Sequence, residues 1–270
     1  FKLTHDHNGE SYLAAIEVDG KMLVDSGVTP ATSVPSIAST VRANPSAGFS
    51  IVTATASSAG DTIGHGLNAS PSLIIAKRTN ATSHWPVYHS SVGANGFTYL
   101  NLTNAAGTGS DFWNNVTPTS SVFTVGSDST VSGGSAVFYC FAPVEGYSAF
   151  GSYIGTGAAA TAPFVYLGFK PEFILFKNKD VSTTNWVQID ATRNTADTVA
   201  SHDRDNPYAL RLRPNTGDVE GQSSDVTVDF LSNGFKIRST ATADDKINGS
   251  LNTIIYAAFA EHPFKTARAV

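Results

Sequence analysis

Along most of the chain, apolar residues alternate with polar ones or form short runs of four to eight residues, a pattern typical of β-strands. It is clearest in residues 49–55, 72–77, 122–125 and 136–142, which are rich in β-branched and aromatic side chains. Clusters of Gly, Asn, Ser and Pro separate these runs and favour tight turns. Nowhere do apolar residues recur at helical spacing for three turns. The pattern predicts an all-β protein of the sandwich or jelly-roll type.

The same succession of strand patterns occurs twice along the chain. Residues 71–77 (PSLIIAK) align with residues 171–177 (PEFILFK), and Trp85 aligns with Trp186. Three later pairs of segments also align: residues 99–102 with 208–212, 122–125 with 234–237, and 138–142 with 256–260. Apolar and aromatic positions recur, whereas the loops between them differ in length and sequence. We therefore predict two tandem, related β-sandwich or jelly-roll-like domains, at residues 48–150 and 151–270.

The first 47 residues follow a different pattern. Residues 12–25 form two strand-like runs around Asp19-Gly20, a strong signal for a hairpin turn. We expect residues 1–28 to be the terminal hairpin of an upstream β domain. Residues 29–47 are rich in Thr, Ser, Pro and Ala, and are expected to form an extended linker or a strap over the first domain. The chain starts at Phe1, and we expect it to be the C-terminal part of a longer polypeptide.

Composition narrows the classes of partner. Only 14% of the 270 residues are charged, against roughly 25% in an average globular protein. The net charge is −5, and the Lys and Arg residues are scattered rather than gathered in the basic stripe expected of a nucleic-acid-binding protein. No apolar run approaches the ~20 residues of a membrane span. We therefore expect neither a nucleic-acid nor a membrane partner.

The residues that usually carry catalysis or bind metals form no recognisable motif. Acidic residues lie mostly in predicted turns, and a pair of catalytic carboxylates brought together by the fold remains the open alternative. The histidines of the first copy, His65, His84 and His89, have no counterparts in the second copy and are expected at the surface. Cys140 lies in an apolar run and is expected in the core. The sequence predicts a protein that is not an enzyme and has neither a cofactor nor a metal.

Trp113 is the candidate ligand contact. It lies in a polar loop between Asp111 and Asn114 and has no counterpart in the second copy, whereas Trp85 and Trp186 align and are expected to pack in the core. Exposed aromatic rings beside Asn and Asp can stack on sugars while the polar groups bind hydroxyls. The alternative is a Trp that anchors its own loop. We take Trp113, Asp111 and Asn114 as the candidate binding residues.

Several stretches resemble a known family. They look like a duplicated module of uncharacterised function, found at the C-terminal ends of structural and tail-fibre-like proteins of tailed phages, especially phages of marine bacteria and cyanobacteria. The resemblance spans roughly residues 48–265 and rests on residues 49–53, 63–67, 71–78, 85–89 and 139–148. The hairpin at residues 12–25 is similar to the closing strands of a concanavalin/laminin-G-like domain.

This resemblance implies a protein of the virion: a fibre, spike or head-decoration component. Its expected partners are other virion proteins and host-surface polysaccharide bound through loops. By analogy with fibre proteins, we expect a homo-oligomer, namely a trimer. One alternative is a purely architectural module without an external ligand. A second is a depolymerase that cuts host polysaccharide.

Overall fold

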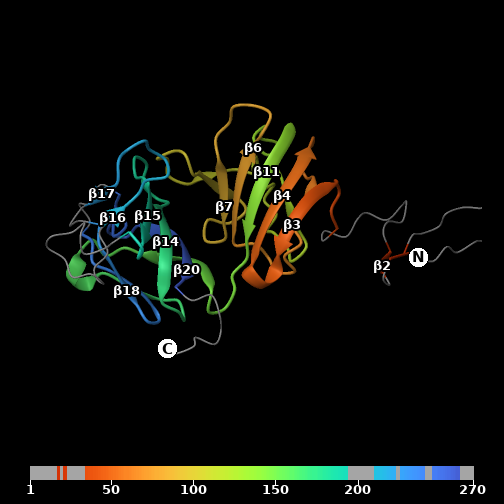
Figure 1. The fold of residues 1–270 in the computed structure, drawn as a ribbon. Helices are drawn as coiled ribbons and strands as arrows, with labels where there is room; N and C mark the ends of the chain where they lie inside the picture. Colours follow the sequence, from red (N-terminus) through yellow and green to blue (C-terminus); the bar gives the residue numbers. More distant parts are fainter. Residues whose placement is uncertain are drawn as a thin grey trace, which may run out of the picture.

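The computed structural model describes residues 17–18, 21–22, 34–193, 210–222, 226–240 and 245–261 (Figure 1). Strands dominate these residues, and the predicted all-β class is confirmed. The helices in this part of the chain are two short 3-10 turns, η1 (Pro45–Ala47) and η2 (Ala159–Thr161). Neither is long and apolar enough to cross a membrane.

The first group of strands forms a two-layer sandwich, here called the first sandwich. Its larger sheet has the strand order β3 (Ser39–Asn44), β4 (Phe49–Ala56), β11 (Gly134–Phe141), β6 (Leu73–Arg78), β7 (Pro86–His89), β8 (Gly96–Tyr99), β9 (Gly107–Thr108). The opposing sheet pairs β5 (Thr62–Gly64) with β10 (Val122–Thr124). The two sheets enclose one apolar core, in which the rings of Phe123 and Phe138 lie 4.9 Å apart.

The second group of strands forms the second sandwich. Its larger sheet has the order β12 (Ser148–Ile154), β20 (Thr253–Ala260), β14 (Pro171–Asn178), β15 (Trp186–Asp190). The opposing sheet has the order β13 (Phe164–Tyr166), β19 (Gly234–Ile237), β18 (Val228–Leu231). Tyr153, Phe176 and Phe235 meet edge to face in its core. A short pair, β16 (Leu210–Arg211) and β17 (Gly221–Gln222), lies beside β15.

The two larger sheets share one strand order. The antiparallel series β4-β11-β6-β7 of the first sandwich matches β12-β20-β14-β15 of the second. Residues 71–77 and 171–177, which align in sequence, overlap β6 and β14. The main-chain N–H of Trp85 donates to the Asn101 side chain, and that of Trp186 donates to Asn215 in the same way. The two halves thus agree in both topology and local contacts.

A third apolar cluster, here called the shared layer, lies between the two sandwiches. Its buried members are Leu73 and Val87 from the first sandwich and Trp186, Ile255 and Ala257 from the second. Strand β20 explains why the layer forms. Its residues alternate between the core of the second sandwich and the shared layer, so both of its faces are buried. This accounts for the continuous apolar run of its sequence, which a strand with one wet face would not need.

Hydrogen bonds cross the boundary beside this layer. The Trp186 indole N–H donates to the carbonyl oxygen of Tyr99 at 2.8 Å. The N–H of Ala106 donates to the carbonyl oxygen of Lys179 at 2.7 Å. These polar groups therefore keep partners where the two sandwiches meet, which avoids the cost of burying them unpaired.

The predicted boundaries need correction. Residues 29–47 are not only a linker, because β3 is a full edge strand of the first sandwich and forms a hairpin with β4 through η1. The boundary between residues 150 and 151 cuts through β12, which pairs along its whole length with β20. Of residues 1–28, the structure describes β1 (Glu17–Val18) and β2 (Lys21–Met22), which pair antiparallel; the rest of the predicted hairpin lies outside the described residues.

We expect Trp186→Ala to reduce the free energy of unfolding by about 3–5 kcal/mol, the usual cost of truncating a buried Trp. The ring fills the shared layer and its N–H bonds to the other sandwich. Trp85→Ala is the matched control, because Trp85 is only partly buried and lies under the Lys77 ammonium. Urea unfolding measures both variants. Equal losses would contradict the assigned role of the shared layer.

Candidate functional site

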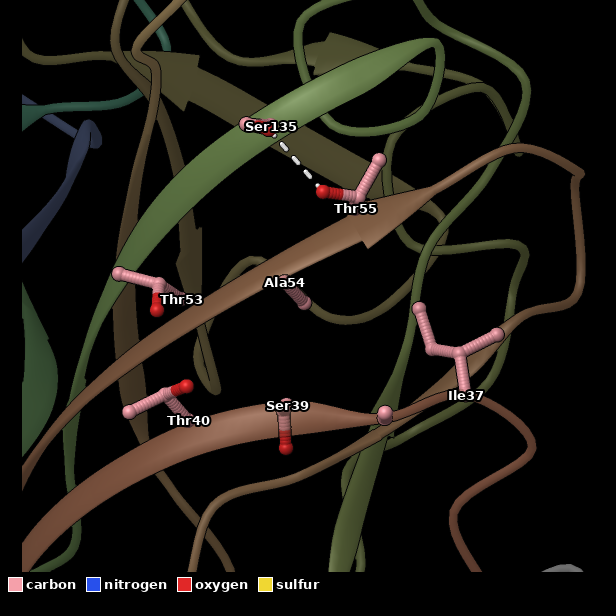
Figure 2. A pocket seen from close by; sticks show the side chains of 8 residues that line it. Ile37, Ser39, Thr40, Thr53, Ala54, Thr55 and Ser135 are labelled. Carbon is pink, nitrogen blue, oxygen red and sulfur yellow. Dashed lines mark hydrogen bonds between the residues drawn. The ribbon is translucent and has the colours of Figure 1, made fainter.

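A groove of about 640 Å³ lies on the outward face of the first sandwich, over β3, β4 and the start of β11 (Figure 2). The residues lining it are small, and many of them carry hydroxyl groups: Ile37, Ala38, Ser39, Thr40, Thr53, Ala54, Thr55 and Ser135. None of these eight side chains titrates in the ordinary pH range.

Strand alternation places the hydroxyl groups of the groove. In β4 the residues Val52, Ala54 and Ala56 point into the core, so Thr53 and Thr55 point out. The register then sets Thr40 of β3 directly beside Thr53. Thr55 and Ser135 share a hydrogen bond of 3.0 Å, drawn in Figure 2.

The hydroxyls of Thr40 and Thr53 are available to a ligand. Both residues are exposed, and neither hydroxyl makes a hydrogen bond within the described part of the chain. The neighbouring Ser39 hydroxyl is already used, since it donates to the carbonyl oxygen of Gly64. A free hydroxyl can both donate and accept. The groove can therefore bind a polar, hydroxyl-rich surface.

The next row on the same face is less polar. By register it contains Arg42 of β3, Ile51 of β4 and Tyr139 of β11, two residues along each strand from the threonine row. Ile51 is 37% exposed, and Tyr139 is partly exposed. The sheet thus presents an aromatic ring and a guanidinium beside the hydroxyls. The sequence pattern alone does not point to these residues. The alternation of residues 50–55 indicates that the two threonines among them face the same side, but only the strand register brings Thr40 beside them.

Trp113 is not the exposed ring that was predicted. It is 1% exposed and packs edge-on against Tyr88 in the core of the first sandwich. Asn114 and Asn115 take left-handed backbone angles just after it, which turns the chain back and tucks the Trp inside. Asp111 lies at the surface and accepts a hydrogen bond from Ser127. Trp113 therefore anchors its loop and does not form a binding surface with Asp111 and Asn114.

The surface prediction is also wrong for His65 and His89, which are buried; His84 is exposed. The N–H of Ser91 donates to His89 Nδ1 at 3.1 Å, so the ring proton of His89 is on Nε2. His89 Nε2 donates to the carbonyl oxygen of Tyr256 at 3.1 Å, and this bond crosses the boundary between the two sandwiches. His65 is bonded in the same way to Leu67 and Thr119. Burial lowers the pKa of His65, and it lowers the pKa of His89 to about 4.

Asp245 is a buried carboxylate of the second sandwich, but both of its oxygens are engaged. Oδ1 accepts from the Asn185 amide at 2.9 Å, while Oδ2 lies 3.1 Å from Arg211 Nε and 3.0 Å from Arg213 Nη2. Two guanidinium groups and one amide beside a single carboxylate hold it in place. This arrangement suits a structural ion-pair network rather than a general acid.

Within the described ranges, no group of three or more His, Cys, Asp or Glu side chains is arranged to hold a metal ion. A second hollow, of about 420 Å³, includes Arg78 and His84 in its lining. The Arg78 guanidinium donates to the carbonyl oxygens of Ser129 and Gly133, at 2.9 and 2.6 Å. The main contact of the Arg78 side chain is therefore with the loop that precedes β11, which it holds in place.

One known protein family matches the chain over most of its length. Residues 22–263 match the family described as "Domain of unknown function (DUF7483)". The chain belongs to this family. The DUF7483 match spans both sandwiches and the shared layer, so the family unit is the pair rather than one half. No curated protein and no solved structure matches the chain.

His89 should make the stability of the protein depend on pH. In the native state its pKa is about 4, against 6.5 for the unfolded chain. The unfolded state therefore binds the proton first as the pH falls, and the stabilisation present above pH 6.5 is lost between pH 6.5 and 4, by up to about 3 kcal/mol. Urea unfolding at pH 7.5 and pH 4.5 measures this loss.

The comparison variant is His89→Gln, which should show a smaller loss than the wild type between these two pH values. His84→Gln, at an exposed position, should keep the wild-type loss. An undiminished loss in His89→Gln would assign the pH dependence to other groups.

Proposed function

We propose that this protein is a non-enzymatic structural and adhesion component of a phage virion, a fibre, spike or head-decoration piece, which binds host-surface glycan in the groove over β3 and β4. The observation that carries the proposal is the set of unused hydroxyls on Thr40 and Thr53, in a groove whose lining holds no titratable side chain. Such a lining can hydrogen-bond sugar hydroxyls but provides no acid or base for their hydrolysis. Tyr139 offers a ring for stacking beside it.

We further infer that the two sandwiches arose by duplication of one unit. The matched strand orders and the matched Trp–Asn contacts support this inference. The outward-facing hydroxyls are only partly retained in the second half. The pairing of each strand with its central neighbour puts Ser152 of β12 in the place of Thr53 and Ile154 in the place of Thr55. The fold was retained while the groove stayed with one half, as expected of a scaffold that carries a site on one surface.

The shared layer favours the architectural part of the proposal. Two sandwiches joined through buried apolar side chains act as one rigid body, which suits a component that spaces or covers a particle. On a particle with many copies, even glycan sites of millimolar affinity would give strong attachment through avidity. A homotrimer, proposed by analogy with fibres, would supply the first level of that multiplicity.

The glycan proposal is tested with a panel of bacterial surface polysaccharides and the double variant Thr40→Val/Thr53→Val. This variant keeps the shape of both side chains and removes two hydroxyls. We expect it to lower binding to any polysaccharide recognised by the wild type by about 30-fold, since each of the two lost hydrogen bonds contributes about 1 kcal/mol. Thr117→Val, at an exposed position outside the groove lining, is the matched control and should bind normally.

Three results would contradict this proposal. If no polysaccharide binds, or if the double variant binds as well as the wild type, the groove is not an adhesion site and the purely architectural function stands. If new reducing ends accumulate when the protein is incubated with a polysaccharide, the protein is a depolymerase.

A further inference from the structure

One side of the first sandwich is closed by the segment that precedes it. Residues 39–44 form β3 and pair with β4, and just before them Ser36 binds to β5. The N–H of Ser36 donates to the carbonyl oxygen of Thr62 at 3.0 Å, and the Thr62 N–H donates to the Ser36 hydroxyl at 2.8 Å. Ile37 and Val41 of this segment pack against the core. One extended segment thus covers the outer edges of both layers.

In the part of the chain that the structure describes, the equivalent side of the second sandwich has no such segment. There β12 takes the place of β4, and β13 takes the place of β5. The residues just before β12 cannot form a matching hairpin strand, because they are held at the first sandwich. The N–H of Ala142 donates to the carbonyl oxygen of Gly48, and Val144 turns directly into Ser148. Among the described residues, no strand pairs with the outer edge of β12 along its length.

The register shows which backbone groups of β12 face outward. Ala260 donates to Tyr147 and Gly155 donates to Asn252, so the odd-numbered residues between them bond to β20. In an antiparallel pair the alternate residues point their N–H and C=O groups the other way. Phe150, Ser152 and Ile154 therefore present three N–H donors and three C=O acceptors to the open edge.

This edge lacks the usual protection against strand pairing. Proteins commonly guard sheet edges with charges, with prolines or by keeping the edge strand short. Strand β12 has seven residues, SAFGSYI, without a charge or a proline. By contrast, β3 carries Arg42 at its edge, β9 has two residues, and Leu212 bridges the outer side of β15.

Exposed aromatic side chains lie on the strand that takes the place of the covered β5. Matching Phe123 of β10 with Phe235 of β19 puts Phe164 in the place of Thr62 and Tyr166 in the place of Gly64. A Cβ atom on Gly64 would lie 3.0 Å from Pro35, so the covering segment leaves little room for a side chain there. Phe164 and Tyr166 are instead 45% and 69% exposed. They offer apolar contact area where the first sandwich has its covering segment.

We propose that the edge of β12 together with Phe164 and Tyr166, here called the β12–β13 site, binds an extended segment of another polypeptide as an added antiparallel strand. The first sandwich shows the kind of segment that fits: like residues 36–44, it alternates small apolar side chains with Ser and Thr and carries little charge. Main-chain hydrogen bonds supply the affinity and alternate side chains supply the specificity. This site does not depend on glycan binding in the groove.

The test uses a fluorescently labelled synthetic peptide of residues 36–46 titrated into the full chain, with binding followed by anisotropy. We expect saturable binding that falls at least about tenfold in Ser152→Pro, which loses one edge N–H and introduces a ring into the path of the added strand. The Ser152 N–H points away from β20, so this change leaves the sheet bonds of β12 intact. Ser152→Ala keeps the N–H and should bind like the wild type.

Further variants separate this site from others. Phe164→Ser/Tyr166→Ser should also weaken binding, whereas Val219→Ser, at another exposed apolar position, should not. A peptide that carries N-methyl groups at alternate residues lacks the main-chain N–H donors needed for strand pairing, so it should not bind the wild-type protein. This check needs no variant of the protein. The proposal is overturned if the peptide does not bind or if Ser152→Pro binds it equally well. It is also overturned if the chain dimerises and Ser152→Pro makes it monomeric, because a second copy then fills the edge.

Discussion

Burial of both faces of β20 is the constraint on which the arrangement of this protein depends. One face of the strand completes the core of the second sandwich, and the other meets Leu73 and Val87 of the first. A fully buried aliphatic or aromatic side chain contributes roughly 1.5–3 kcal/mol, so a layer of this kind is a large part of the stability of a domain. Hydrogen bonds from Trp186 and His89 cross the same boundary and restrict how the sandwiches can be oriented.

The shared layer also determines which surfaces remain open. It covers the outward face of the first sandwich at β6 and β7 but leaves β3 and β4 exposed, where the hydroxyl groove lies. In the second sandwich it covers the outward face of β20, while the outer edge of β12 carries no partner strand in the described part of the chain. The proposed glycan contact and the proposed strand-binding site are thus on different sandwiches. Under the proposed function, that separation would let the protein attach to the particle with one half and to a host with the other.

Much of the fold could be predicted from the sequence. The short apolar runs became β4, β6, β10 and β11, and the absence of helical periodicity gave the all-β class. The shared layer could not be predicted, because the continuous apolar run of β20 is consistent with burial of both faces but does not show which surface covers the second face. Trp186 was expected in a core and is buried, but in the layer between the sandwiches. The burial of Trp113 and His89 depends on contacts with residues distant in sequence, which local pattern does not reveal.

The functional residues were harder to predict than the fold. Thr40, Thr53 and Thr55 are ordinary outward positions of strands, and only pairing across three strands makes them a groove. The central claim, that the shared layer joins the two sandwiches into one cooperative body, is tested most directly by differential scanning calorimetry of the whole chain. We expect a single transition whose calorimetric and van't Hoff enthalpies agree. Two separate transitions, one for each sandwich, would contradict the account.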